Sequence, residues 1–138
     1  MSDAVTRRAS GSFDVKLGPQ PLSHSEADPL LGRMSIDKQF HGELEGMSQG
    51  EMLSAMTAVK GSAGYVAIER VSGTLHGRSG SFVLQHIGTM TRGAPQLSVT
   101  VVPDSGTGEL AGLAGRMAIE IADGRHSYTF DYALGATS

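Results

Sequence analysis

The chain has 138 residues, which suits one domain, and its 11 basic and 14 acidic residues give a net charge of -3. It contains no cysteine, which excludes a disulfide scaffold, thiolate zinc sites and a cysteine nucleophile. The longest basic run is Arg7-Arg8, and no apolar run approaches the roughly 20 residues of a membrane helix, so we expect neither a nucleic-acid nor a membrane partner. The N-terminus lacks the apolar core of a signal peptide, and a cysteine-free chain suits the cytoplasm, where we expect the protein.

The N-terminal part of the chain predicts a short lead-in and a first strand. Residues 1–8 are polar and unpatterned, so we expect a disordered segment there and a single domain over residues 9–138. From Ser12 to Leu17 apolar and polar residues alternate, which is typical of a strand with one buried face. Residues 18–30 contain three prolines and predict a long loop rather than part of a sheet.

The remaining segments read as short strands with tight connections. Met34 to Phe40 alternates with period two, whereas residues 49–60 fit either a helix or a strand; we favour a strand because the neighbouring strands need a pairing partner. Asp123-Gly124 is a strong signal for a two-residue hairpin turn. Further strands are predicted at residues 65–71, 82–87, 97–102, 117–121 and 126–134.

These segments add up to about eight strands without a convincing long helix. Strands that follow each other in sequence mostly pair with each other, and eight antiparallel strands in a meander can close on themselves. We therefore predict an all-β fold, an eight-stranded antiparallel up-and-down β-barrel, with an open sandwich as the alternative.

A glycine motif of the form G-x-L-x-G recurs three times. The copies lie at residues 42–46, 73–77 and 108–112, each before a predicted strand. Glycine permits positive φ angles and sharp bends at barrel corners, and the central leucine is expected to plug one end of the core. We interpret the motif as structural, because the context of a phosphate-binding or dinucleotide-binding loop is missing.

Several polar residues fall on faces that a barrel would turn inward. Glu69 shares a face with Tyr65, His86 follows Phe82 on one face, and His126 lies on the same face as Phe130. A buried carboxylate beside imidazoles can move protons, although the same groups can form a purely structural network. The catalytic candidates are His86, His126, Glu69 and Tyr128. The ligand-binding candidates are Tyr65, Lys38, Phe82, Leu84, Phe130 and Tyr132.

A lysine and the histidines allow two further interpretations. Lys38 lies among apolar neighbours and either extends to the rim of the barrel or reaches an acid inside it. Two histidines and a carboxylate can hold zinc, but their spacing matches no recognised signature, so we expect no metal and no cofactor.

Three segments resemble a known family. Residues 77–86, 104–110 and 126–132 are similar to blocks of the DUF3224 family of uncharacterised bacterial proteins, and the resemblance spans roughly residues 10–134. It implies an eight-stranded barrel like that of allene oxide cyclase and the dirigent proteins, which guide reactive intermediates inside an apolar cavity. It also implies self-association as a dimer or trimer, whereas no catalytic residue is established that carries over.

The function expected from these observations is the binding of a small apolar molecule inside the barrel. The bound molecule would undergo a cofactor-free isomerisation or cyclisation if the polar residues converge on it. Two alternatives stay open: a carrier with the same cavity and no chemistry, and a structural or interaction protein whose barrel is packed solid.

Overall fold

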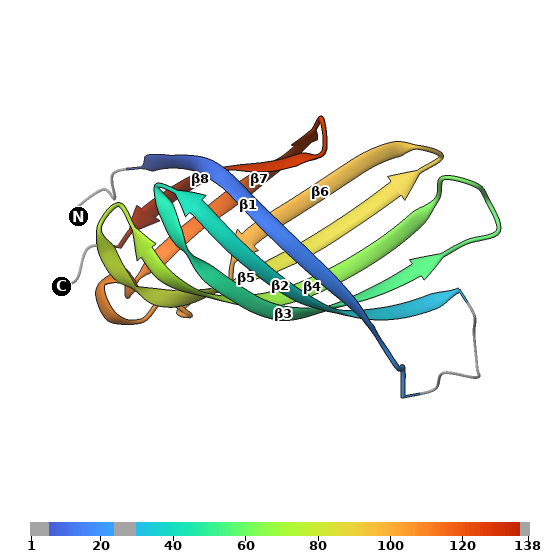
Figure 1. Ribbon diagram of the computed structural model, residues 1–138, viewed down its shortest axis with the longest axis horizontal. Helices are drawn as coiled ribbons and strands as arrows, with labels where there is room; N and C mark the ends of the chain where they lie inside the picture. The colour runs from blue at the N-terminus through green and yellow to red at the C-terminus, as the bar shows by residue number, and fades with distance from the viewer. Residues whose placement is uncertain (1–5, 24–29, 136–138) are drawn as a thin grey trace.

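The computed structural model, which describes residues 6–23 and 30–135, is a closed barrel of eight antiparallel strands in sequence order (Figure 1). The strands are β1 (Arg7–Gln20), β2 (Leu31–Gly42), β3 (Leu44–Met56), β4 (Ala63–Leu75), β5 (Arg78–Thr91), β6 (Ala94–Val101), β7 (Leu113–Ala122) and β8 (Arg125–Leu134). One short 3-10 helix, η1 (Gly108–Leu110), interrupts the connection from β6 to β7. In the described ranges no helix is long and apolar enough to cross a membrane.

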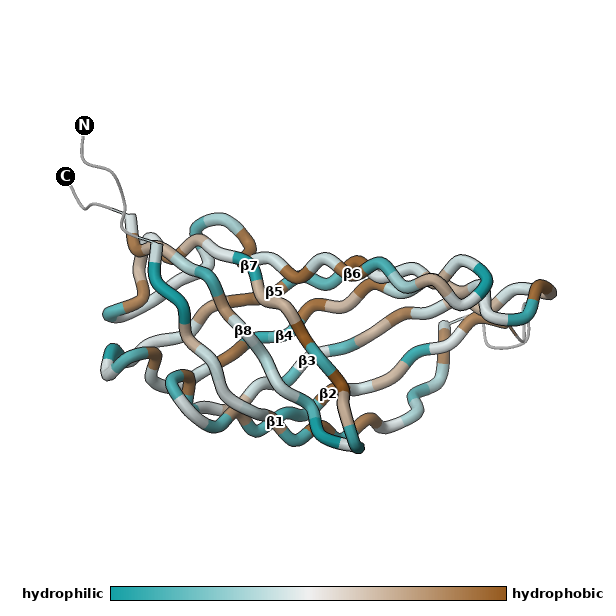
Figure 2. Tube along the Cα trace, turned by 90° about the horizontal axis from the view of Figure 1, so that it is seen from above, coloured by the Kyte–Doolittle hydropathy of each residue, from teal (hydrophilic) through white to brown (hydrophobic). Residues whose placement is uncertain are grey.

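The predicted meander is confirmed, and the alternative of an open sandwich is excluded by closure through β1 and β8. The ambiguous segment 49–60 is strand as far as Met56, where β3 pairs residue by residue with β2 and β4. Asp123 and Gly124 form the tight turn between β7 and β8, with φ angles of 52° and 75°. Period-two alternation is visible along the chain trace, where hydrophobic and hydrophilic residues follow one another in the strands (Figure 2).

Two predicted boundaries differ from the structure. β1 continues to Gln20, so the prediction of a loop from residue 18 is wrong for Gly18, Pro19 and Gln20. Pro19 is tolerated because β1 pairs with β8 only as far as Phe13; beyond that residue it is an edge strand bonded to β2 alone. Residues 24–29 of the predicted loop lie outside the described residues. β1 begins at Arg7, and residues 1–5 of the predicted lead-in also lie outside the description.

The two ends of the barrel differ in construction. At one end, here called the closed end, lie the turns at residues 43 and 76–77, the connection 102–112, the start of β1 and the end of β8 (Figure 1). Leu44, Leu75 and Leu110, the central leucines of the three glycine motifs, are fully buried there and plug the core as predicted. The glycines let neighbouring strands approach closely: Gly46 lies opposite Gly73, where an added Cβ would fall 2.6 Å from the partner's Cα.

The other end, here called the open end, carries the turns at residues 57–62, 92–93 and 123–124. β6 and β7, which are both fully described, pair only at Val99 with Met117 and at Thr100 with Arg116. The rest of this seam diverges toward the open end (Figure 1). The buried apolar core is therefore concentrated in the closed half of the barrel, where the rings of Phe40, Phe82 and Phe130 are at most 1% exposed.

Candidate functional site

Three charged or polar side chains from neighbouring strands meet inside the barrel. Lys38 extends from β2, Glu69 from β4 and His86 from β5, and all three are at most 8% exposed. Each occupies an inward position of its strand, between apolar residues two positions away. Burying these groups is unfavourable unless they bind one another, so their arrangement is a specific feature of the interior.

A single carboxylate oxygen connects the three groups. Lys38 Nζ donates a hydrogen bond to Glu69 Oε2 at 2.9 Å, and His86 Nε2 lies 2.7 Å from the same oxygen. Because the carboxylate can only accept, Nε2 carries a proton, and in the neutral form of the imidazole the other ring nitrogen, Nδ1, is an acceptor. The hydroxyl of Tyr65 lies 3.4 Å from His86 Nδ1, so it is the donor that the imidazole can accept from. The result is a chain from Tyr65 through His86 and Glu69 to Lys38.

Electrostatics fix the protonation states of two members of this chain, Glu69 and Tyr65. Burial raises the pKa of Glu69, but the hydrogen bond from His86 and the positive charge of Lys38 outweigh it, so the pKa lies below its ordinary value. Burial, followed by the negative charge of Glu69, raises the pKa of Tyr65. At neutral pH the carboxyl group is therefore ionised, and the phenol keeps its proton.

The lysine is held from a second direction by aromatic rings. Its ammonium group lies 4.8 Å from the ring centroid of Phe13 and 5.7 Å from that of Phe40, both within cation–π range. Of the two interpretations of Lys38, the structure therefore has the one in which it reaches an interior acid. The rings and the carboxylate together replace the water that the ammonium group loses.

Two polar atoms beside this chain have no hydrogen-bond partner among the described protein groups. They are the second carboxylate oxygen, Glu69 Oε1, and the hydroxyl oxygen of Ser48, whose residue lies opposite Lys38 in the pairing of β2 with β3. Both atoms are fully buried. They give the interior an additional acceptor and an additional hydroxyl that a small polar group can use.

An apolar cavity of about 420 Å³ occupies the open half of the barrel. Its lining contains no charged side chain, and it includes Leu97 of β6 and Ile121 of β7, from the two strands that border the diverging seam. The lining residues are Met52, Ser54, Ala63, Gly64, Tyr65, Gly88, Thr89, Met90, Pro95, Gln96, Leu97 and Ile121. Tyr65 thus belongs both to the cavity wall and to the buried polar chain.

The structure brings together only part of the predicted catalytic group. Glu69 and His86 are hydrogen-bonded to each other, as the hypothesis of a proton-moving cluster requires. Their further partners are Lys38 and Tyr65, which the sequence placed among the ligand-binding candidates. Four other ligand-binding candidates are core residues at most 2% exposed that do not line the cavity: Phe82, Leu84, Phe130 and Tyr132.

His126 lies apart from the polar chain. Its ring is 5.2 Å from that of Phe13, whose ring in turn lies against Lys38. His126 lines a separate open depression of about 460 Å³ with Ser12 and Arg125. No described hydrogen bond joins this imidazole to Glu69, and Phe13 separates it from the lysine.

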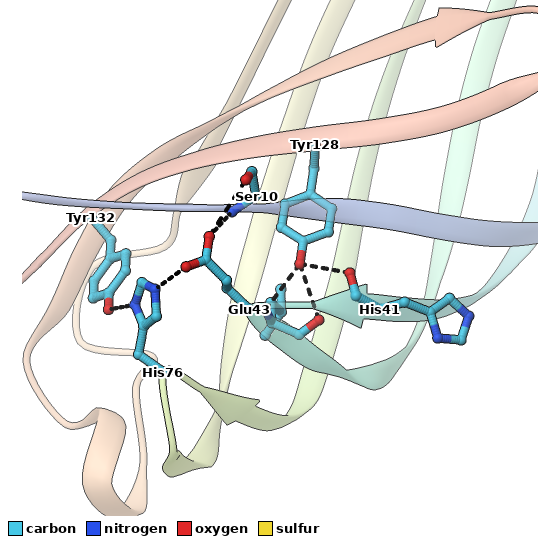
Figure 3. Close-up of polar contacts among 7 residues, drawn as sticks. Ser10, His41, Glu43, His76, Tyr128 and Tyr132 are labelled. Atoms are coloured by element: carbon cyan, nitrogen blue, oxygen red, sulfur yellow. Dashed lines mark hydrogen bonds and ion pairs between the residues drawn. The ribbon is translucent and has the colours of Figure 1, made fainter.

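Tyr128 has a structural position at the closed end (Figure 3). Its hydroxyl accepts a hydrogen bond from the backbone N–H of Leu44 at 2.9 Å and lies 2.9 Å from the carbonyl oxygen of His41, to which it can donate. The phenol therefore ties β8 to the turn between β2 and β3. Burial is the main reason that its pKa is raised, so this hydroxyl stays protonated.

A second carboxylate–imidazole–phenol chain lies near Tyr128 (Figure 3). Glu43 Oε2 is 2.9 Å from His76 Nε2, and His76 Nδ1 is 2.5 Å from the hydroxyl of Tyr132. Glu43 also accepts a hydrogen bond from the backbone N–H of Ser10 at 2.9 Å. This chain links β8, the β1 backbone and two turns, and none of its side chains lines the apolar cavity, so we interpret it as a structural link that closes this end of the barrel.

Sequence reasoning missed Glu43 and His76 and most of the cavity wall. Glu43 and His76 occupy variable positions of the first two glycine motifs, which were interpreted only for their glycines and leucines. Cavity residues such as Met52, Met90 and Leu97 continue the inward period of strands beyond their buried stretches. That continuation is a signal in the sequence, and it would have identified them.

Among the described residues no group of three or more His, Asp or Glu side chains is placed to hold a metal ion.

Comparisons with known proteins agree with this architecture. The family described as "Protein of unknown function (DUF3224)" matches residues 9–132. A crystal structure of a protein of unknown function from the same family, from Shewanella oneidensis MR-1, is 57% identical, with a TM-score of 0.91. The match covers 96% of this chain and 100% of that chain. No curated protein matches the sequence.

Proposed function

The chain belongs to the DUF3224 family of proteins of unknown function, and from this premise we propose that it binds a small, largely apolar molecule in the open half of its barrel. One observation carries the proposal: Tyr65, whose hydroxyl ends a buried polar chain, lines an otherwise uncharged, apolar cavity. Binding sites for small molecules typically combine such a wall with a few well-placed polar groups. The cavity volume of about 420 Å³ is within the range usual for such sites.

A cavity that binds must also admit its guest. The diverging seam between β6 and β7 supplies an opening, since Leu97 and Ile121 line the cavity and are 44% and 69% exposed. Large apolar side chains exposed along such a seam are unfavourable in water, and covering them with a guest lowers the free energy. The closed half of the barrel is filled with side chains and forms the floor.

Cavity filling tests the binding proposal. Ala63 lines the cavity, whereas Ala55 lies on the neighbouring strand and outside the lining. We expect Ala63→Phe to abolish binding of an uncharged fluorescent probe, N-phenylnaphthylamine, and the matched control Ala55→Phe to retain it. Fluorescence titration measures both. Equal binding by the two variants, or none by the native protein, would contradict the proposal.

The buried chain favours a second step, in which the protein acts as a cofactor-free isomerase. Tyr65 Oη can take a proton from a bound molecule while its own proton moves to His86 Nδ1, and the imidazolium formed is stabilised by Glu69. Reversing the two transfers returns the proton to another atom of the molecule.

A β,γ-unsaturated ketone tests this step, because moving one proton converts it into the conjugated isomer, which absorbs ultraviolet light. We expect turnover by the native protein and a loss of at least tenfold in His86→Gln, with binding of the ketone unchanged. Tyr65→Phe should lose turnover to the same extent. A carrier would bind the ketone equally well and show no turnover in any variant, which would overturn the isomerase proposal and leave binding intact.

A further inference from the structure

Two cations without a described side-chain partner lie on turns at the open end of the barrel, whose rim is here called the mouth. Lys60 belongs to the turn between β3 and β4, and Arg92 to the turn between β5 and β6; both side chains are exposed. No ion pair or side-chain hydrogen bond holds either of them within residues 6–23 and 30–135. By contrast, Arg8 and Arg33 are each engaged in an ion pair with a neighbouring acid.

Hydrogen bonds join the two turns, so Lys60 and Arg92 lie on the same part of the rim. The backbone N–H of Gly93 donates to the carbonyl oxygen of Gly61 at 2.9 Å, and that of Arg92 donates to Ser62 Oγ at 3.0 Å. Gly61 has a φ of 82°, and a Cβ there would fall 3.0 Å from the Gly93 nitrogen. The contact therefore depends on glycine, and it joins two turns whose bonded residues, Ser62 and Arg92, are 30 positions apart in the sequence.

Turn chemistry alone does not explain an arginine at this place. Arg92 and Gly93 have φ angles of 48° and 90°, and a two-residue turn with both angles positive favours Asn or Asp at the first position. The turn at Asp123 follows that preference. His76 departs from it and is accounted for by its contacts with Tyr132 and Glu43. Arg92 also lacks the Asn or Asp that this position favours, and no described contact of its side chain accounts for the arginine. Its guanidinium group is therefore available to bind a ligand.

The residues next to these cations belong to the cavity. Ala63 follows the first turn, Met90 precedes the second, and both line the apolar wall. Positive charge therefore stands at the mouth, an uncharged lining follows it, and the hydroxyl of Tyr65 lies further along β4 toward the core.

From this order we infer that the ligand is an amphiphile, an aliphatic carboxylate whose chain fills the cavity and whose anionic head lies between Lys60 and Arg92. The inference rests on the proposed function and adds the class of molecule. An arginine binds a carboxylate through two parallel hydrogen bonds, and a neighbouring lysine adds a second positive charge. On the hairpin of β7 and β8, Asp123 and Arg125 carry one charge of each sign, so among the residues that the structure describes this turn does not offset the charges of Lys60 and Arg92.

Decanoate and decanol separate this inference from the binding proposal, because they share a chain and differ in charge. Displacement of N-phenylnaphthylamine gives the affinity of each. We expect the native protein to prefer decanoate, and Lys60→Glu/Arg92→Glu to weaken decanoate roughly tenfold, as two exposed ion pairs would, while decanol binds as before. Added salt should reduce the preference for decanoate in the native protein.

Arg70→Glu/Arg78→Glu is the matched control, since it makes the same change of net charge with exposed residues away from the mouth. It should keep the preference for decanoate. An equal loss in this control, or equal binding of the two compounds by the native protein, would overturn the inference and leave the proposed function standing. Failure of both compounds and the probe to bind would overturn the proposed function itself.

Discussion

Gly50 lies directly opposite Glu69 in the pairing of β3 with β4, and a Cβ on Gly50 would fall 2.8 Å from the Cβ of that glutamate. Both positions face the interior of the barrel, so the missing side chain on one strand makes the space that the buried carboxylate occupies on the other. The buried polar chain therefore requires a glycine on the neighbouring strand in addition to its own polar residues.

Replacing this glycine should disturb the fold. We expect Gly50→Ala to destabilise the protein by roughly 1–3 kcal/mol, because the added methyl group meets backbone atoms that cannot move aside. Gly64→Ala is the control: its Cβ would lie no closer than 3.7 Å to any neighbour, so its stability should be unchanged or slightly higher. Urea unfolding measures both variants, and equal stability of the two would contradict this account.

The buried ion pair should show strong coupling. Lys38→Met leaves the Glu69 carboxylate in the core without its cation, which is expected to cost about 3–5 kcal/mol. Lys38→Met/Glu69→Met should lose less than the sum of the two single variants, since neither charge is then left unpaired. A double-mutant cycle in urea checks this. Arg8→Met, which breaks an exposed pair with Asp131, should change stability little, and additive losses at Lys38 and Glu69 would refute the coupling.

Acid should destabilise the protein through Glu69. The pKa of this group is lower in the folded chain than its ordinary value of 4.5, so its contribution is fully present above that pH. The contribution is lost progressively as the pH falls through the lower, folded pKa. Unfolding free energies measured from neutral pH downward should therefore decline below 4.5. Glu69→Gln should be less stable at neutral pH but show a shallower decline; an unchanged slope would contradict the assignment.

The hydroxyl of Tyr128 should matter for stability and not for binding. Tyr128→Phe leaves the buried N–H of Leu44 without its acceptor, which is expected to cost about 1–3 kcal/mol. Tyr65→Phe should cost less, because its bond to His86 is long at 3.4 Å. Thermal unfolding together with probe titration distinguishes the two roles. A larger loss of stability in Tyr65→Phe would reverse them.

Much of the fold could be predicted because strand signals are local. The alternation from Ser12 to Leu17, the Asp123-Gly124 turn and the recurring glycine motifs each report a backbone geometry within a few residues. Pro19 shows the limit: whether a proline is acceptable depends on whether its strand is bonded on one side or both. That is a property of the closed sheet and is absent from the segment itself.

The candidate site could be predicted only in part. The inward faces of Glu69 and His86 follow from period two, but which polar groups meet depends on the stagger between strands. The stagger brings Lys38 next to Glu69, whereas it puts His126 against the ring of Phe13 and away from Glu69. Tyr128 and Tyr132 share the inward face of His126, yet they lie beyond it at the closed end, where their hydroxyls fasten turns.

The short pairing of β6 with β7 has a kinetic consequence. Barrel closure normally leaves no free strand edges, yet here the main-chain groups of residues 94–98 and 118–122 that face the seam are not bonded across it. Separating these two strands breaks few hydrogen bonds, so the wall can part locally while the other seven ladders stay intact. Guest exchange would then be governed by this breathing motion, and amide hydrogens along the slit would exchange with solvent long before those of β3 and β4.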